Sequence, residues 1–329
     1  MRKRFIQSIV VFSFAVAFFW LLAALGVGAD VRFTRIAPLT NKEIALTITG
    51  SNGPSYRIEA STNLSTWGAV VTLPGASATA VHTDSAAPYL MERTYRGLQL
   101  DGTNNLTGDH LITTNGDVVI HPINHASFVM SWQGKMIYND PAGATTLYSG
   151  LPKADLILVS HTHSDHFIAA NLDAVRGPTA VIIAPQAVYN AMSTALRAVT
   201  IVLTNGAATT AIGGGIEAIP AYNISNMNHP LGVGNGYVLT IGGKRIYIAG
   251  DTEDVPAMRA LQNIDVAFVP INRPYTMDLA SAVNAVRTFR PAVVYPYHYS
   301  PSTPVTDVSL FKRSVGQDLG IEVRLRKWY

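Results

Sequence analysis

The chain has 329 residues, of which 48% are hydrophobic and 14% charged, so it is long and apolar enough to form a large core. It contains no cysteine, which excludes disulfide bonds, thiolate metal ligands and cysteine nucleophiles. The formal net charge is +3, but the first 29 residues hold three of the 24 basic side chains and none of the 21 acidic ones. The rest of the chain is therefore neutral overall, which argues against nucleic acid as a partner.

Residues 1–29 have the pattern of a secretory signal peptide. A basic tip, RKR, precedes a long apolar stretch, and valine and alanine occupy the −3 and −1 positions of a cleavage site that ends at Ala29. We therefore expect cleavage after Ala29 and a periplasmic or secreted protein. The alternative is an uncleaved membrane anchor, because residues 6–27 form a stretch of 22 residues that could span a bilayer.

Residues 30–105 are predicted to form a small β-sandwich module. Short runs rich in Ile, Val, Thr and Tyr, separated by turn clusters such as GSNGPS and PGASA, lie at 43–50, 55–62, 68–75, 79–84 and 92–100. The stretches YRIEASTNLSTWGAVVT and RTYRGLQL resemble the small fibronectin-like modules of secreted bacterial proteins. Such a module would suit contact with polysaccharide or a cell surface. A linker rich in Gly, Asn and Thr is expected at 101–110.

Residues 106–329 are predicted to form a second domain in which strands and helices alternate. The expected strands lie at 117–123, 127–132, 135–140, 154–160, 180–185, 215–222, 236–241, 244–250, 266–271 and 292–298. The expected helices lie at 185–199, 254–263 and 279–290. Asp251 or Thr252 could cap the second helix, and Thr276 or Asp278 the third. This pattern favours two sheets with helices on the outside.

The segment SHTHSDH at 160–166 is the densest group of metal-binding side chains in the sequence. His161 and His163 can face one ion, and Asp165 and His166 can face a neighbouring one. Imidazole and carboxylate suit zinc, manganese or iron. Four ligands cannot complete two coordination shells, so other loops must contribute. The alternative is a solvated polar loop that binds no metal.

Three further segments sharpen this interpretation: AIPAYN at 218–223, AGDT at 249–252 and PYHY at 296–299. Together with SHTHSDH, and in this order, they resemble the metallo-β-lactamase superfamily, over roughly 112–329. The resemblance is to the broad branch of metal-dependent hydrolases that includes lactonase-like and phosphodiesterase-like members. It implies an α/β (α+β) fold, a four-layer αββα sandwich, with two divalent ions bridged by a hydroxide at one edge between the sheets. Zinc is the expected ion, and manganese and iron are the alternatives.

The resemblance also implies a ligand for each position. His161 and His163 would bind the first ion, Asp165, His166 and His298 the second, and Asp251 would bridge both. Taken singly, His298 could instead be an ordinary core histidine, and Asp251 a helix cap.

The third ligand of the first ion is an open question. Many relatives place a histidine where this chain has Asn223, and His229 is the expected replacement. We expect His125, Asp140, Asn223 and Tyr222 to orient ligands or contact substrate.

The function predicted from these residues is hydrolysis of a small ester, lactone or phosphodiester by the metal-bridging hydroxide. Asp165, His166 and Asp251 are the expected catalytic residues, with Asp165 moving a proton to the leaving group. Tyrosines near the ligands (Tyr222, Tyr295, Tyr297 and Tyr299) could stabilise an oxyanion. The alternatives are a β-lactamase-type amide hydrolase, a nuclease of the same fold, a di-iron redox enzyme and a metal-free binding protein that keeps the fold.

Overall fold

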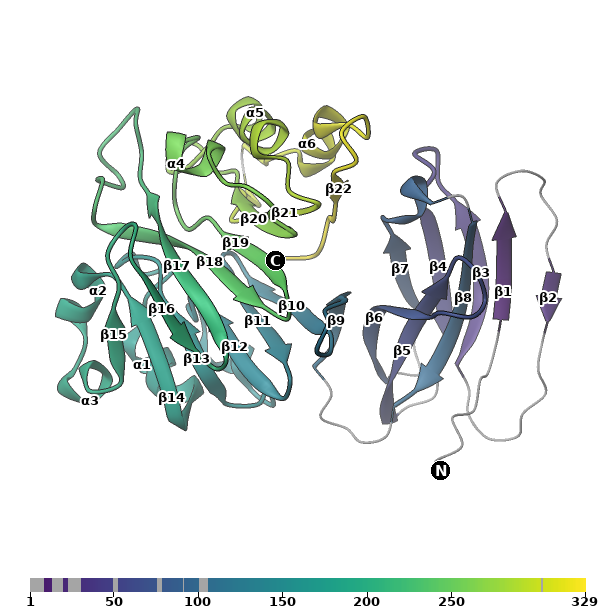
Figure 1. Ribbon diagram of the computed structural model, residues 1–329, viewed down its shortest axis with the longest axis horizontal. Helices are drawn as coiled ribbons and strands as arrows, with labels where there is room; N and C mark the ends of the chain where they lie inside the picture. The colour runs from purple at the N-terminus through teal and green to yellow at the C-terminus, as the bar shows by residue number, and fades with distance from the viewer. Residues whose placement is uncertain are drawn as a thin grey trace. The chain divides into compact units, whose positions relative to one another are not determined.

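The computed structural model describes residues 9–13, 20–22, 31–49, 53–75, 79–90, 92–100, 106–302 and 304–329. The chain divides into two compact units (Figure 1): Met1–Ile112 with Asp117–His121, and Thr113–Gly116 with Pro122–Tyr329. The expected signal peptide lies outside the described residues, apart from the short strands β1 (Ile9–Ser13) and β2 (Trp20–Leu22). Within the described ranges, no helix is long and apolar enough to cross a membrane.

The first unit contains two antiparallel sheets that enclose one core. The first sheet has the order β3-β4-β7, made of β3 (Arg32–Pro38), β4 (Ile44–Thr49) and β7 (Ala80–Asp84). The second has the order β6-β5-β8, made of β5 (Gly53–Ser61), β6 (Gly68–Gly75) and β8 (Glu92–Gln99). Alternate residues of β4 point inward, so that Ile44, Leu46 and Ile48 pack with Tyr56 and Ile58 of β5. The alternating runs in the sequence therefore form the strands expected of them.

Strand β9 (Gly108–Leu111) occupies part of the segment that the sequence predicts to be a linker. It pairs with β6 and with β10 (Val118–Asn124), and Gly108 allows the close approach because a Cβ there would lie 2.1 Å from the carbonyl oxygen of Ile120. His110 joins these strands, with Nε2 2.7 Å from the Thr72 hydroxyl and Nδ1 3.0 Å from Asp117. Strand pairing thus overrides a composition that is typical of loops.

The second unit contains two sheets that face each other. The first has the order β15-β14-β13-β12-β11: β11 (Ser127–Trp132), β12 (Lys135–Asn139), β13 (Ala154–Leu158), β14 (Arg176–Ala184) and β15 (Thr200–Val202). The second runs from β16 to β22: β16 (Ala208–Ala211), β17 (Gly214–Ala221), β18 (Gly234–Ile241), β19 (Lys244–Ile248), β20 (Val266–Pro270), β21 (Val293–Tyr297) and β22 (Glu322–Val323). Phe128 of β11 stacks on Phe268 of β20, with ring centroids 4.2 Å apart, and so joins the two inner faces.

Helices cover the outer faces of this sandwich (Figure 1): α1 (Ala169–Val175), α2 (Gln186–Ala191) and α3 (Thr194–Arg197) beside the first sheet, and α4 (Pro256–Arg259), α5 (Leu279–Phe289) and α6 (Val308–Val315) beside the second. On α5, Ala282, Val286 and Phe289 pack in one core cluster with Tyr247 and Val294 of the second sheet. All ten strands predicted for this domain are present, and the predicted αββα layering is confirmed.

The helices depart from the sequence prediction in two places. The helix predicted at 185–199 is broken into α2 and α3, because Ser193 leaves the helical conformation and caps α3 by accepting the N–H of Leu196. The helix predicted at 254–263 shortens to the single turn of α4. Asp278 caps α5 as predicted, but α4 begins too far along the chain for Asp251 or Thr252 to cap it. Their side chains are therefore available for other contacts.

Candidate metal centre

The predicted ligands come from four loops that meet at one edge of the two facing sheets. The segment 160–166 follows β13, Asp251 follows β19, His298 follows β21, and His229 lies between β17 and β18. Strand β13 is parallel to β12 and β14, and β19 and β21 are parallel to β20. The carboxyl ends of parallel strands share an edge, so residues that are distant in the sequence meet there.

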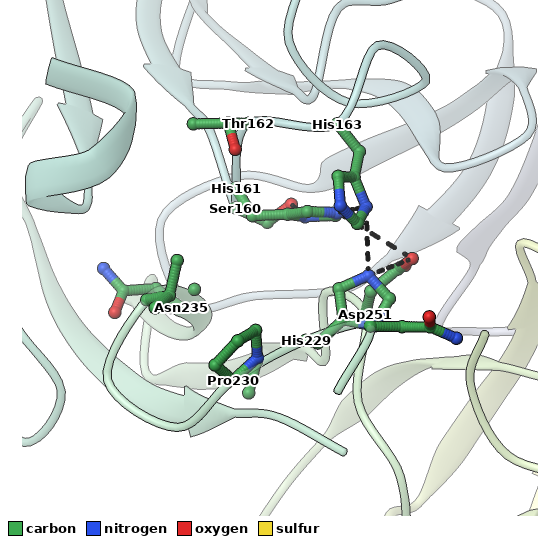
Figure 2. A pocket seen from close by; sticks show the side chains of 12 residues that line it. Ser160, His161, Thr162, His163, His229, Pro230, Asn235 and Asp251 are labelled. Atoms are coloured by element: carbon green, nitrogen blue, oxygen red, sulfur yellow. Dashed lines mark hydrogen bonds and ion pairs between the residues drawn. The ribbon is translucent and has the colours of Figure 1, made fainter. Parts of the chain in front are cut away.

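His161, His163 and His229 form the first group, and their nearest ring nitrogens all lie within 4.8 Å of one another. Nδ1 of His163 is 3.1 Å from Nε2 of His161 and 3.2 Å from Nε2 of His229. The other nitrogen of His229 lies 3.1 Å from the carbonyl oxygen of Tyr275 and 3.3 Å from Oδ1 of Asn223. These acceptors orient the ring so that Nε2 faces the group, as second partners of metal-binding histidines do. Asn223 thus supports His229, and a pocket opens beside the group (Figure 2).

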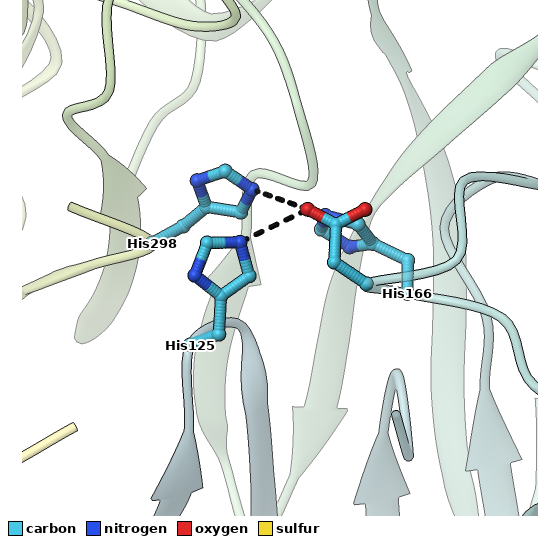
Figure 3. A group of neighbouring side chains, drawn as sticks. His125, His166 and His298 are labelled. Atoms are coloured by element: carbon cyan, nitrogen blue, oxygen red, sulfur yellow. Dashed lines mark hydrogen bonds and ion pairs between the residues drawn. The ribbon is translucent and has the colours of Figure 1, made fainter. Parts of the chain in front are cut away.

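His125, Asp165, His166 and His298 form the second group, again within 4.8 Å (Figure 3). Oδ2 of Asp165 lies 3.0 Å from Nε2 of His125, 3.6 Å from Nε2 of His298 and 3.8 Å from Nε2 of His166. His166 and His298 are buried, whereas the side chain of Asp165 is 48% exposed. One carboxylate therefore faces three imidazoles at the solvent side of the site.

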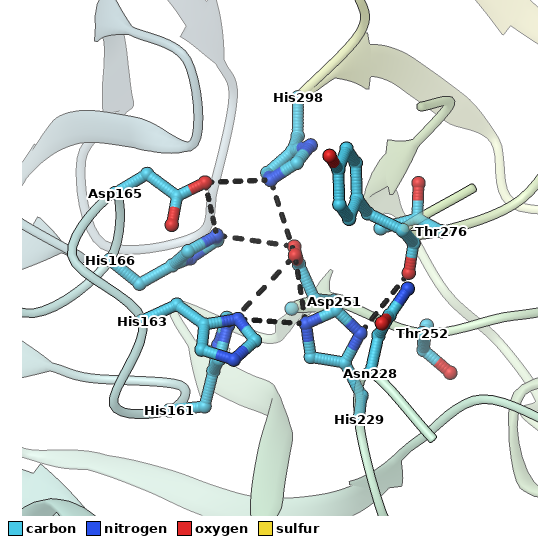
Figure 4. A network of polar contacts seen from close by, with 12 residues as sticks. His161, His163, Asp165, His166, Asn228, His229, Asp251, Thr252, Thr276 and His298 are labelled. Carbon is cyan, nitrogen blue, oxygen red and sulfur yellow. Dashed lines mark hydrogen bonds and ion pairs between the residues drawn. The ribbon is translucent and has the colours of Figure 1, made fainter. Parts of the chain in front are cut away.

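Asp251 lies between the two groups (Figure 4). Oδ1 is 3.2 Å from Nε2 of His166, and Oδ2 is 3.2 Å from Nε2 of His298 and 3.3 Å from Nε2 of His229. Oδ1 of Asp251 and Nε2 of both His166 and His298 are buried, and among the described residues these atoms make close ion-pair contacts but no well-aligned hydrogen bond. Buried polar atoms without well-aligned hydrogen bonds are costly. Nitrogen and carboxylate donors that converge in this way fit divalent cations, so the residues present match the metal that the superfamily implies.

Asp140 orients His166 from behind. It is fully buried and accepts hydrogen bonds from the backbone N–H of Ser160 at 2.7 Å, from the Ser160 hydroxyl at 2.7 Å and from Nδ1 of His166 at 2.8 Å. The bond to Nδ1 leaves Nε2 of His166 facing Asp251. The sequence expected Asp140 to orient a ligand, and the structure places it where it can do so.

Tyr329 is a site residue that the sequence does not reveal. Its hydroxyl donates to the carbonyl oxygen of Tyr299 and lies 2.6 Å from Nδ1 of His125. His125 in turn packs against His298, with ring centroids 3.8 Å apart and the ring planes tilted by 44°. Because 204 positions separate Tyr329 from His125, no local pattern could indicate this contact.

Three residues at the site have a left-handed backbone: His125, with φ 55°, Asp140, with φ 41°, and His298, with φ 45°. Such conformations cost roughly 1–3 kcal/mol each for residues other than glycine, and they concentrate at functional sites. Each of the three follows directly on the end of a strand, so the sheet holds a turn that aims the side chain at the site.

The charge states of the site suit a cation. Burial lowers the pKa of both His161 and His163, and the neighbouring histidines lower it further, so these rings are neutral. Burial would raise the pKa of Asp251, but the charges of His166 and His298 outweigh it, and the carboxyl is ionised. Burial lowers the pKa of His298, but Asp251 and Asp165 raise it to about 9, so a cation must displace a proton from this ring.

The tyrosines expected to stabilise an oxyanion mostly have other contacts. The hydroxyl of Tyr297 is buried and accepts the N–H of Gly250 at 3.0 Å, and burial raises its pKa. Arg324 donates to the hydroxyl of Tyr295 at 3.1 Å. Tyr222 packs against the core cluster formed by the second sheet with α4 and α5. Tyr297 therefore helps to hold the turn that presents Asp251.

The comparisons with known proteins agree with this site. Residues 119–298, more than half of the chain, match the family model of the beta-lactamase superfamily domain. Fold and site together thus define a member of the metallo-β-lactamase superfamily. The chain is 34% identical over 209 residues to a UPF0173 metal-dependent hydrolase of Thermococcus kodakarensis, a match that covers 59% of this chain and 90% of that protein.

Two solved structures resemble the same region. A metal-dependent hydrolase from Parabacteroides distasonis is 38% identical with a TM-score of 0.61, and the match covers 68% of this chain and all of that one. The metallo hydrolase Igni18 from Ignicoccus hospitalis is 29% identical with a TM-score of 0.55, and the match covers 64% of this chain and 95% of that one. The chain belongs to the metal-dependent hydrolases of the metallo-β-lactamase superfamily.

Proposed function

We propose that the second unit binds two divalent metal ions, by default zinc, and uses them to hydrolyse a small ester, lactone or phosphodiester. The observation that carries the proposal is the position of Asp251, which lies between two separate groups of donors. His161, His163 and His229 would hold one ion, and Asp165, His166 and His298 the other, with Asp251 shared. A single ion could not use all seven side chains, because first-row divalent ions commonly take four to six ligands.

Each residue has a task in such a reaction. Bound divalent cations lower the pKa of water towards neutrality and polarise an oxygen of the substrate. Asp165 is the carboxylate best placed to move a proton, because it is half-exposed and faces the second group. It would take a proton from the attacking water and pass it to the leaving group. His125 holds Asp165 through Nε2, and Tyr329 fixes the ring of His125.

The proposed type of scissile bond comes from the sequence and not from the names of the relatives. The names of the relatives state only that those proteins are metal-dependent hydrolases. The ester, lactone or phosphodiester assignment rests on the likeness of AIPAYN, AGDT and PYHY to the lactonase-like and phosphodiesterase-like branch. Attack of water would give a tetrahedral carbon in an ester or lactone and a pentacoordinate phosphorus in a phosphodiester. Two cations could stabilise the negative charge that develops in either case.

The test is a reporter panel run on protein reconstituted with zinc, manganese or iron, with metal content measured in the same samples. The proposal expects two equivalents of metal and turnover of a lactone, aryl ester or phosphodiester reporter. If the protein turns over only a β-lactam reporter, the proposal is wrong and the activity is amide hydrolysis. Protein that binds no metal and turns over no reporter would instead be a binding protein with this fold.

We also propose export and tethering, on the sequence pattern alone. Cleavage after Ala29 would leave Asp30 as the first residue of the secreted protein. Mass spectrometry of the protein recovered from the periplasm or medium tests this, and a retained Met1 in the membrane fraction would point to an uncleaved anchor. Retention of the first unit on insoluble polysaccharide tests the tethering role.

A further inference from the structure

Five large apolar side chains are exposed on two loops beside the first histidine group. The exposed fractions are 80% for Met227, 64% for Leu231, 63% for Ile224, 53% for Tyr275 and 38% for Val233. We call these five residues the apolar rim. Single exposed apolar residues are ordinary, but a group of them beside a binding site is typical of a surface that contacts a ligand.

The two loops of the rim are joined to each other and to the metal centre. The loop between β17 and β18, residues 222–233, carries four rim residues and also His229. The amide of Asn223 donates to the carbonyl oxygen of Tyr275 at 2.8 Å, and the amide of Asn226 donates to that of Pro274 at 3.1 Å. Because Nδ1 of His229 also faces the Tyr275 carbonyl, the rim and the first histidine group are positioned by the same backbone.

Glu253 fixes the first part of the longer loop. Its carboxylate accepts the backbone N–H of Ile224 at 2.7 Å and of Ser225 at 2.8 Å, and also the hydroxyl of Ser225. Glu253 is itself only 8% exposed. These charge-assisted hydrogen bonds to a nearly buried carboxylate hold residues 224 and 225 in place. The backbone that carries Ile224 is thus fixed, so a ligand that binds this side chain does not have to order this part of the loop first.

The rim adjoins the pocket that Figure 2 shows beside the metal ligands, because Val233 lines that pocket. This pocket has a volume of about 60 Å³ and is lined by His161, His163, His229 and Asp251 and, on the same loop as the rim, by Pro230 and Val233. A pocket of this size takes the reacting group but not a long substituent. Val233 belongs to both the pocket and the rim, so a substituent that leaves the pocket on this side meets apolar side chains.

We propose that the substrate carries an apolar acyl or alkyl chain of several carbons next to the scissile bond, and that the apolar rim binds this chain. The inference rests on the proposed function and narrows its substrate class. Arg273 lies beside the rim, but its charge does not oppose the binding of an apolar chain, because its guanidinium pairs with the carboxylate of Glu253 at 3.8 Å. Continuity with the pocket favours the substrate itself as the occupant over a bilayer or a second copy of the chain.

The test is a chain-length series on the metal-loaded full chain. The probes are p-nitrophenyl esters from acetate to octanoate, or alkyl p-nitrophenyl phosphodiesters of the same lengths if the reporter panel identifies phosphoryl chemistry. A fully buried methylene corresponds to about fourfold in affinity, so a chain half-buried on the rim should gain about twofold in kcat/KM per methylene. This gain in kcat/KM should come from a lower KM, with kcat unchanged.

Two variants locate the effect. Met227→Ser combined with Leu231→Ser should flatten the series, so that the ratio of octanoate to acetate kcat/KM falls at least several-fold. The matched control is Leu310→Ser on α6, a leucine that is 41% exposed and lies outside the rim; it should keep the wild-type ratio. If the double variant does not fold, competitive inhibition of the wild type by 1-butanol, 1-hexanol and 1-octanol replaces it, with inhibition constants that should fall with chain length.

The outcomes separate this inference from the proposed function. Turnover of acetate with no gain for longer chains overturns the inference and leaves the proposed function standing. No turnover of any probe by protein that carries two metal ions counts against the proposed function itself. A flat series together with binding to phosphatidylcholine vesicles that the double variant loses would assign the rim to a bilayer. A flat series with a dimer that the double variant loses would assign it to a second copy.

Discussion

Replacing Asp140 with asparagine should weaken binding of the second metal ion without removing any of its ligands. Asp140 is fully buried and accepts three hydrogen bonds, two from Ser160 and one from Nδ1 of His166. An asparagine keeps the size but loses the charge, and its NH2 group cannot accept from the donors that now face a carboxylate. Loss of such an orienting partner typically costs 10–100-fold in metal affinity, or about 1.4–2.8 kcal/mol.

The assay is competition with a chromophoric zinc chelator, which resolves two binding steps. Asp140→Asn should weaken one step by that factor and leave the other, assigned to His161, His163 and His229, within about twofold of the wild type. Asp173→Asn is the control, since Asp173 is an exposed carboxylate that pairs with Arg176. Thermal unfolding of the metal-free proteins corrects for any loss of stability. Wild-type affinity for both ions in Asp140→Asn would refute the orienting role of Asp140.

The remaining predictions concern other contacts. Tyr329→Phe removes the hydrogen-bond partner of Nδ1 of His125, and turnover should fall about fivefold at unchanged metal content, because one hydrogen bond is worth about 1 kcal/mol; unchanged kcat would contradict this. His229→Ala should leave one equivalent of metal by elemental analysis, and two equivalents would show that His229 is no ligand. Chelation with EDTA should abolish turnover, and added zinc should restore it; turnover that survives chelation would remove metal from the mechanism. Asp84→Asn breaks a buried pair with Arg93 and should cost the first unit about 3–5 kcal/mol in unfolding free energy, measured with urea; a loss below 1 kcal/mol would contradict it.

The pair between Asp84 and Arg93 also sets an acid limit for the first unit. Burial would raise the pKa of Asp84, but the charge and hydrogen bond of Arg93 lower it below 3.8 in the folded state. A carboxyl whose pKa is lower in the folded state stabilises the unit, and this stabilisation is complete at a pH above the pKa of the unfolded state. It is lost as the pH falls through the pKa of the folded state. We therefore expect the wild type to lose stability below about pH 4, whereas Asp84→Asn should lose less over the same window. Parallel pH profiles for the two proteins would contradict this.

The parts of the site that the sequence predicts are those encoded by short segments after strands. His161, His163, Asp165 and His166 lie within one turn, and periodicity alone placed a buried strand before them. The strands themselves were predictable for the same reason: apolar runs such as ADLILV leave few other choices. The AGDT segment predicts Asp251 as a ligand. The other interpretation, that Asp251 caps a helix, is excluded only by the structure, in which α4 begins at Pro256.

The parts that the sequence could not predict depend on contacts between distant segments. His229 can face His163 because the N–H of Asn223 donates to the carbonyl oxygen of His229 and closes the loop between them. Glu253 fixes that loop from 28 and 29 positions away, and Tyr329 reaches His125 from 204. Composition also misled at 108–111, where pairing with β6 and β10 made a strand from a segment that reads as a linker.

Titration of metal-free protein with zinc, followed by turnover at each addition, tests the central claim most directly. Six proposed ligands in two groups, with Asp251 shared between them, require that turnover rise to its plateau at two equivalents of zinc per chain. Asp251→Asn, which changes the shared carboxylate alone, should fail to reach that plateau at any zinc concentration that leaves the protein soluble. A plateau at one equivalent, or full turnover in Asp251→Asn, would contradict the dinuclear site.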